Sequence, residues 1–142
     1  MSVGAYLTFN GNCREAVEFY AEVFQTETPQ IMTFGESPQS SEYPLPEEAK
    51  ELVMHTRLNI DGSNVMFSDT FSGQEFVIGN NITLALVSKN KDELKSWYEQ
   101  LKEGGKIDME LQETFWSKLY GQVTDKFGIH WQLNYDNSET TM

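Results

Sequence analysis

The sequence predicts an α+β fold made of two tandem modules, each with the element order strand, helix and three strands. Three observations support this: two amphipathic helices, several strands of period two, and a repeat that relates the two halves of the chain. With 142 residues, 39% of them hydrophobic, the chain is long enough to bury a core. We expect a single domain, with module one at about 1–69, a connector at 70–79, module two at about 80–136 and a disordered tail at 137–142.

The segment at 112–135 is the most aromatic part of the chain and ends in a strand of strict period two. Its aromatic residues are Phe115, Trp116, Tyr120, Phe127, Trp131 and Tyr135. In the final strand, apolar and polar residues alternate, with Ile129, Trp131, Leu133 and Tyr135 against His130, Gln132 and Asn134. One face of this strand can therefore enter a core while the other offers polar groups to a cavity.

The first module is predicted to begin with a strand at 3–9 and a helix at about 13–25. Asn12 stands at the N-cap position and Glu15 follows three residues later, which is the spacing of a capping box. The apolar stripe of this helix is Ala16, Phe19, Tyr20, Val23 and Phe24. A second strand is expected at 28–34. The Pro-rich segment at 35–51 is expected to be a long loop with a short helix at 47–52, serving as a lid, a partner contact or plain surface.

A β-hairpin completes the first module. A strand at 53–60 and its partner at 64–68 flank Asp61-Gly62, a strong turn signal. In the first of these strands, His55, Arg57 and Asn59 alternate with the residues of the opposite face, Met54, Thr56, Leu58 and Ile60. The polar face is expected to line a ligand cavity or to meet solvent.

The second module repeats this order. We expect a strand at 81–87, a helix at 90–103 closed by Gly104-Gly105, and strands at 106–112, 119–124 and 129–135. The buried stripe of the helix is Leu94, Trp97, Tyr98 and Leu101. A shift of 78 residues places Glu15 on Glu93 and Tyr20 on Tyr98, so we infer a duplication. Two curved mixed sheets would then surround a shared cleft, which is the default ligand site.

Composition excludes several classes of function. The net charge is −12, with 22 acidic against 10 basic residues, so we expect neither nucleic acid nor an anionic membrane as partner. No apolar run is long enough for a membrane span or a secretory signal. Cys13 is the single cysteine and fits a reducing cytoplasm. Its place near a helix start allows for a lowered thiol pKa and a reactive role, although a structural role is the commoner outcome.

Several sequence blocks carry a family resemblance. They are Tyr6 to Phe9, Gly11 to Cys13, Ala16, Phe19-Tyr20, Met66, Ser68-Asp69, Gly105 to Ile107, Gln112 to Trp116, Gly121, Val123 to Gly128 and Trp131. These blocks and the order of elements resemble the vicinal-oxygen-chelate superfamily of glyoxalase I, extradiol dioxygenases and bleomycin-resistance proteins, and more narrowly its PhnB-like (YjdN-type) branch. The resemblance implies a glyoxalase-like fold and, since relatives on this fold usually pair, a homodimer.

The resemblance also implies where a metal would be held. Metal-dependent relatives take four His or Glu ligands from the first and last strand of each module. The matching positions here hold Ala5 or Tyr6, Met66, Thr83 and Gln132. None of these offers an imidazole or a carboxylate, so we expect no metal site there and no cofactor. Labels for this branch mention a demethylubiquinone methyltransferase, but the sequence lacks a strand-borne Gly-rich loop followed by a ribose-binding acid, so a SAM-dependent methyltransferase is not expected.

Six residues are the candidates for a ligand cavity: His55, Arg57, Phe115, Trp116, His130 and Gln132. The histidines can bind a ligand, act as weak catalytic candidates, join other residues at a metal, or simply be satisfied by neighbours and water. Arg57 can hold a carboxylate or phosphate, or form a salt bridge. Phe115 and Trp116 can wall a cavity or plug the core.

The leading hypothesis is therefore a metal-independent, cytoplasmic protein that binds an unknown small molecule, comparable to resistance proteins that sequester their ligands. The alternative is a metal-dependent or acid–base enzyme of the lyase, isomerase or dioxygenase type with relocated catalytic groups, His55 and His130 being the candidates. A third possibility is a structural or regulatory dimer with a vestigial cleft.

Overall fold

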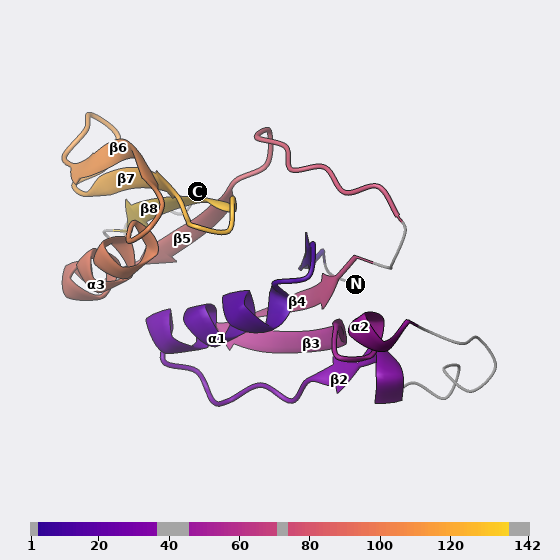
Figure 1. The fold of residues 1–142 in the computed structure, drawn as a ribbon. Helices are drawn as coiled ribbons and strands as arrows, with labels where there is room; N and C mark the ends of the chain where they lie inside the picture. The colour runs from indigo at the N-terminus through magenta and orange to yellow at the C-terminus, as the bar shows by residue number, and fades with distance from the viewer. Residues whose placement is uncertain (1–2, 37–45, 71–73, 137–142) are drawn as a thin grey trace. The chain divides into compact units, whose positions relative to one another are not determined.

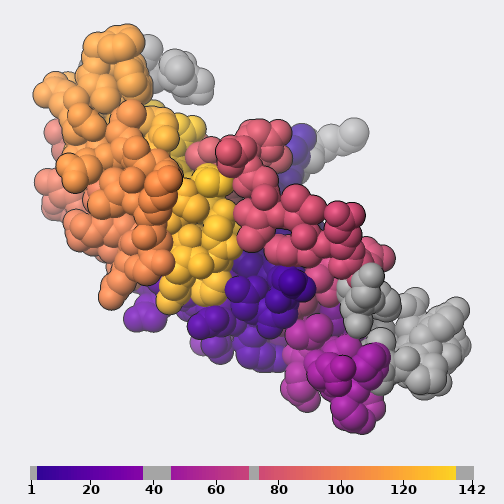
Figure 2. Space-filling view, turned by 45° about the horizontal axis from the view of Figure 1, so that its top comes forward, coloured from indigo at the N-terminus to yellow at the C-terminus, as the bar shows by residue number. Residues whose placement is uncertain are grey.

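The computed structural model describes residues 3–36, 46–70 and 74–136. The chain divides into two compact units between Val77 and Ile78, inside the expected connector at 70–79. The connector residues at 74–79 lie on the molecular surface (Figure 2), with Val77 and Ile78 exposed. No helix in the described ranges has the length and apolar character that crossing a bilayer requires.

The first unit is a four-stranded mixed sheet with one long helix on it (Figure 1). Its elements are β1 (Ala5–Phe9), α1 (Cys13–Val23), β2 (Met32–Thr33), η1 (Phe34–Glu36), α2 (Glu47–Lys50), β3 (Val53–Ile60) and β4 (Ser63–Asp69). The strand order is β1-β4-β3-β2, with β1 and β4 parallel and the other pairs antiparallel. The helix α1 packs on β3 and β4.

The second unit has the same topology. Its elements are β5 (Leu84–Ser88), α3 (Lys91–Leu101), β6 (Lys106–Gln112), β7 (Tyr120–Thr124) and β8 (His130–Tyr135). The strand order is β5-β8-β7-β6, again with a parallel first pair. The helices α1 and α3 begin 78 residues apart, at Cys13 and Lys91. The predicted α+β fold of two repeated modules is therefore confirmed.

The apolar stripes of the two helices form much of each core. Leu94, Trp97, Tyr98 and Leu101 of α3 are all buried, as predicted. In α1 the buried residues are Cys13, Ala16, Val17, Tyr20 and Val23, whereas Phe19 and Phe24 are only half-buried. The buried face of α1 is thus rotated slightly towards Val17, a residue that the stripe prediction omitted.

The start of α1 is stabilised by a side chain from another strand and not by its own N-cap. Asn12 makes no side-chain capping bond, so the predicted capping box is wrong. Asp69 Oδ1, at the end of β4, accepts hydrogen bonds from the backbone N–H groups of Gly11 (2.9 Å) and Cys13 (3.0 Å). Its Oδ2 accepts from Val53 N at 2.9 Å. At α3 the local rule holds, because Asn90 Oδ1 accepts from Glu93 N at 3.1 Å.

The predicted second strand at 28–34 is mostly absent. Only Met32 and Thr33 pair with β3, with an irregular register. Pro29 has no N–H group and cannot donate a hydrogen bond to a neighbouring strand. The carbonyl of Gln30 accepts a hydrogen bond from the hydroxyl of Thr56 at 2.8 Å, in place of one from a backbone N–H group. The segment at 25–31 therefore runs beside β3 without forming a continuous strand with it.

The hairpin turn and the short helix of the first unit form where the sequence predicts them. Asp61 (φ 50°) and Gly62 (φ 92°) form the turn between β3 and β4, because both adopt the positive φ that such a hairpin turn needs. The short helix predicted at 47–52 is α2, preceded by Pro46. The rest of the predicted loop at 37–45, part of the connector at 71–73 and the tail at 137–142 lie outside the described residues.

Asp69→Ala is expected to lower the free energy of unfolding by roughly 3–5 kcal/mol, because three backbone N–H groups lose their acceptor inside the protein. Asn12→Ala is the matched control and should cost only a few tenths of a kcal/mol, well below the ~1 kcal/mol of a functioning N-cap. Urea denaturation of both variants measures this. Equal losses in the two variants would contradict the assignment of the cap to Asp69.

Candidate functional site

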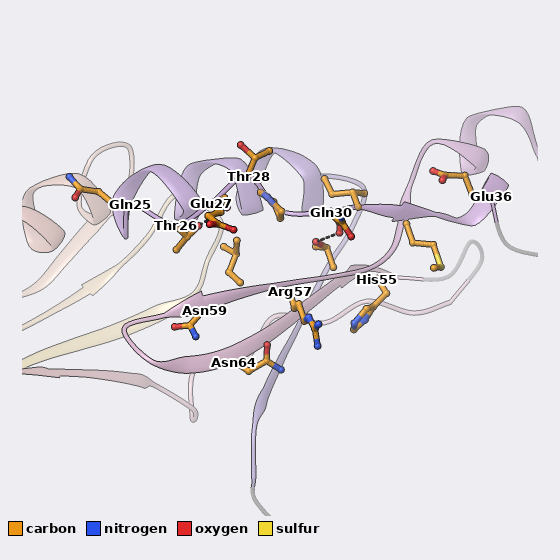
Figure 3. Close-up of a pocket in the computed structure, with 15 residues that line it drawn as sticks. Gln25, Thr26, Glu27, Thr28, Gln30, Glu36, His55, Arg57, Asn59 and Asn64 are labelled. Atoms are coloured by element: carbon orange, nitrogen blue, oxygen red, sulfur yellow. Dashed lines mark hydrogen bonds between the residues drawn. The ribbon is translucent and has the colours of Figure 1, made fainter.

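The first unit contains a large open cavity along the edge of β3. Its volume is about 1090 Å³, slightly above the usual range for small-molecule sites. It lies between the segment at 25–32 and the strand, as Figure 3 shows. The lining residues are Gln25, Thr26, Glu27, Thr28, Pro29, Gln30, Ile31, Met32, Glu36, His55, Thr56, Arg57, Leu58, Asn59 and Asn64.

The predicted polar face of β3 faces away from the core. Thr56, Leu58 and Ile60 are buried, whereas Arg57 and Asn59 are exposed. On the neighbouring strand, Met66 pairs with Arg57 and Asn64 pairs with Asn59. Because directly paired residues share a face of a sheet, these side chains form one polar surface with a methionine within it.

Tyr6 joins this surface from β1. It pairs with Met66, whereas Ala5 pairs with the buried Val65. The structure thereby resolves the one-residue ambiguity of the sequence, and Tyr6 occupies the outward position. Its hydroxyl lies 3.4 Å from Nδ1 of His55 and the two ring centroids are 5.9 Å apart.

A chain of hydrogen bonds crosses the polar face of the second sheet. Thr124 Oγ1 lies 2.6 Å from Asp108 Oδ2 and 2.9 Å from His130 Nδ1. The other ring nitrogen of His130 lies 3.3 Å from the carbonyl oxygen of Gly79. His130 is thus held at both nitrogens by groups of its own unit.

Gln132 takes part in a second polar cluster. Its Oε1 accepts a short hydrogen bond from the Tyr120 hydroxyl, and that hydroxyl accepts from Gln122 Nε2 at 3.0 Å. The ring of Trp116 stands edge-on to Tyr120, with centroids 5.4 Å apart. Tyr120, Gln122 and Thr124 are site residues that were not predicted from the sequence, although their spacing of two along β7 matches that of His130 and Gln132 along β8.

Phe115 and Trp116 are presented by a hydrogen-bonded turn. Ser117 N donates to Thr114 Oγ1 at 3.1 Å, and Thr114 N donates to Ser117 O at 2.8 Å. Phe115 is 97% exposed and Trp116 54% exposed, so the alternative that these rings plug a core is wrong. The structure thus brings His55 and Arg57 together in the first unit, and Trp116 close to the Tyr120–Gln132 cluster in the second.

The donor set at the superfamily's ligand positions does not suit a tightly held divalent ion. Tyr6 and Met66 pair directly, and they offer a phenol and a thioether. Gln132 pairs with Ala85, and Thr83 precedes β5. Such ions favour imidazole, carboxylate or thiolate donors. Within the described ranges, His, Cys, Asp and Glu form no group of three or more that could hold a metal.

Cys13 is a core residue and not a reactive thiol. It is fully buried at the start of α1. Burial, assisted by the nearby carboxylate of Asp69 and opposed by Arg14, raises the pKa of its thiol to about 12. The lowered pKa considered from its position near a helix start is therefore wrong, because loss of hydration outweighs the helix terminus.

The geometry of each unit is that of a known class of protein. A glyoxylase/bleomycin resistance protein/dioxygenase domain from Frankia sp. EAN1pec has the same fold, with a TM-score of 0.64 at 13% identity over 95% of this chain and 96% of that one. The two chains therefore share a fold, the glyoxalase-like fold that the sequence blocks indicated.

The chain belongs to the PhnB/YjdN-like family, whose sequence profile is described as 3-demethylubiquinone-9 3-methyltransferase and matches residues 2–134. It is 36% identical to Protein YjdN of Escherichia coli K12, over 99% of both chains. The crystal structure of PA1353 from Pseudomonas aeruginosa is 32% identical, with a TM-score of 0.83, and covers 96% of this chain and 98% of that one.

The methyltransferase description finds no support in this chain. In the described residues, two connections lead from a strand into a long helix, at 10–12 and at 89–90. Neither is a Gly-rich loop of the kind that approaches a nucleotide or nucleoside cofactor.

The unfolding free energy of the protein is expected to fall between about pH 9 and 12, and Cys13→Ala is expected to reduce that fall. A thiol whose folded-state pKa is raised from 9.0 to about 12 adds stability that is fully present below the unfolded pKa and is lost as the pH rises towards 12. Denaturation at several alkaline pH values measures this. Lys and Tyr titrate in the same window, so only the difference between the two proteins is diagnostic, and identical slopes would contradict the burial of the thiol.

Proposed function

We propose that the protein binds a small organic molecule on the polar faces of its sheets and does so without the divalent metal of the superfamily. The observation that carries this proposal is the cavity of about 1090 Å³ beside His55, Arg57 and Asn64. The donor set at Tyr6, Met66, Thr83 and Gln132 supports the metal-free part of the proposal. The single cysteine, buried as Cys13, fits action in the cytoplasm.

An acid–base enzyme is the second candidate, and one arrangement favours it. Asp108, Thr124 and His130 form a continuous hydrogen-bonded row that can orient the imidazole. Against it, both ring nitrogens of His130 already have neighbours at hydrogen-bonding distance within the second unit. An acid–base role would require a ring nitrogen of His130 to leave its present neighbour, whereas a binding role does not. We therefore propose the binding role.

Protein purified without a His tag is expected to hold no stoichiometric zinc, nickel or manganese, because the family positions lack ionisable donors. Elemental analysis after mild purification measures the metal content. His130→Ala is the paired variant, since His130 and Gln132 are the best remaining donors. If the wild-type protein holds one metal ion per chain and the variant holds none, the metal-free binding role is contradicted and the enzyme is favoured.

The binding role itself is tested with a thermal-shift screen of a small-molecule library. A ligand present at a hundred times its Kd stabilises the folded state by about 2.7 kcal/mol, which is a clear rise in Tm. A substitution within the cavity, Asn64→Leu, should reduce that rise, while Asn90→Ser, at the cap of α3, should not. A complete absence of hits would favour the structural or regulatory role.

We also propose that the protein is a homodimer. Phe115 and Trp116 are exposed on an ordered turn, and exposed aromatic rings of this kind are common where a surface is covered by a partner. Light scattering at micromolar concentration is expected to give about twice the chain mass of 16.3 kDa. A mass of one chain under these conditions would end this proposal.

A further inference from the structure

We infer that the outward face of the first sheet is an oxyanion subsite, in which Arg57 binds a carboxylate or a phosphoryl group of the ligand. This inference rests on the proposed small-molecule function and specifies the chemistry of the ligand. Its starting point is the position of one cation in a strongly acidic chain.

Among the described residues that line the cavity, Arg57 is the one lysine or arginine, and it is available for a ligand. Elsewhere in the chain, Lys50, Lys102 and Lys106 form ion pairs with nearby carboxylates. The guanidinium of Arg14 approaches the carbonyl of Glu51 at 3.5 Å. Arg57 has no hydrogen bond, ion pair or ring contact with any residue in the described ranges, although the chain carries 22 acidic residues. A guanidinium left unpaired in a cavity of such a chain is suited to an external anion.

The groups beside Arg57 are hydrogen-bond donors. His55 and Asn59 lie two residues to either side on the same face of β3, and Asn64 lies opposite Asn59. Asn59 Oδ1 already accepts from Gly62 N at 2.8 Å, so its Nδ2 group remains as a donor. A Tyr6 hydroxyl that donates to His55 Nδ1 leaves the ring proton on Nε2. Arginine, imidazole and amide donors therefore converge on one surface.

Two acidic residues, Glu27 and Glu36, also line the cavity. Figure 3 shows Glu27 and Glu36 across β3 from Arg57 and His55. Glu36 is also occupied, because its Oε1 accepts from Thr33 N at 3.4 Å and Thr33 Oγ1 at 2.9 Å. The carboxylate of Glu36 is therefore engaged by Thr33.

Two large side chains, Met66 and Tyr6, lie beside Arg57 on this face of the sheet, next to the residues that line the cavity. The thioether of Met66 pairs across from Arg57, and the ring of Tyr6 pairs across from Met66. An anion attached to a small apolar or aromatic body would place its charge at Arg57 and its body over these two side chains. A planar fork of guanidinium donors can hold either carboxylate or phosphoryl oxygens in pairs.

The test is a titration of the full-length protein, followed by ¹H–¹⁵N NMR, with phenylphosphonate, benzoate and the neutral benzamide. We expect one or both anions to shift the signals of Arg57, His55, Asn59 and Asn64. The anion that binds more tightly shows whether the subsite prefers a phosphoryl group or a carboxylate. Arg57→Gln should weaken that binding about ten- to hundredfold, the range of a charged hydrogen bond. Arg57→Lys should restore only part of it, because lysine lacks the fork. Arg14→Gln, which removes the other arginine of this unit, should leave it unchanged.

Three results would overturn the inference: anion binding that survives Arg57→Gln, no shift of these signals by either anion, or benzamide binding as tightly as the anions. The last result would leave the small-molecule function standing, because the cavity would still be occupied. That function fails separately, if no compound of the library binds wild-type protein.

Discussion

The buried carboxylate of Asp69 is the interaction on which the first unit depends. It lies at the end of β4, is 3% exposed, and accepts hydrogen bonds from three backbone N–H groups. Two of these belong to the turn that starts α1 and one to the start of β3. Because a buried carboxylate needs its charge satisfied by donors, this residue joins the helix to the sheet at the end where β1, β3 and β4 come together.

Asp125 has a comparable role in the second unit. Its Oδ1 accepts from the N–H groups of Phe127 (2.8 Å) and Ile129 (3.1 Å), which shapes the turn between β7 and β8. Its Oδ2 accepts from the indole N–H of Trp131 at 2.8 Å, which directs that ring into the core. The neighbouring residues of β8, His130 and Gln132, then face the opposite side of the sheet, where the polar clusters form.

The outward faces of the two sheets differ in chemistry. Among described residues, the first sheet presents an unpaired guanidinium with amides and an imidazole, while the second presents polar groups that are largely bonded to each other. The hydrogen bonds within the second face hold its side chains in place and leave fewer of their polar atoms for a ligand. The first face has the capacity to bind an external anion, so the two repeated modules present different surfaces.

The sequence alone determined the elements and their faces. Helix stripes and period-two strands report which side of each element is apolar, and this local information was enough to predict two repeated modules and the placement of His55, Arg57, His130 and Gln132 on the polar faces of their strands. The tertiary structure decided what depends on contacts between distant residues. Asp69 caps α1 in place of Asn12 because the fold brings its carboxylate next to the start of the helix. The two residues are 57 positions apart in the sequence, so no local pattern could predict this. The thiol pKa of Cys13 is raised by burial, which no local pattern reveals. β2 is short because Pro29 has no N–H group and the carbonyl of Gln30 is bonded to Thr56. The cavity lies along the stretch at 25–31, where the chain runs beside β3 without pairing with it.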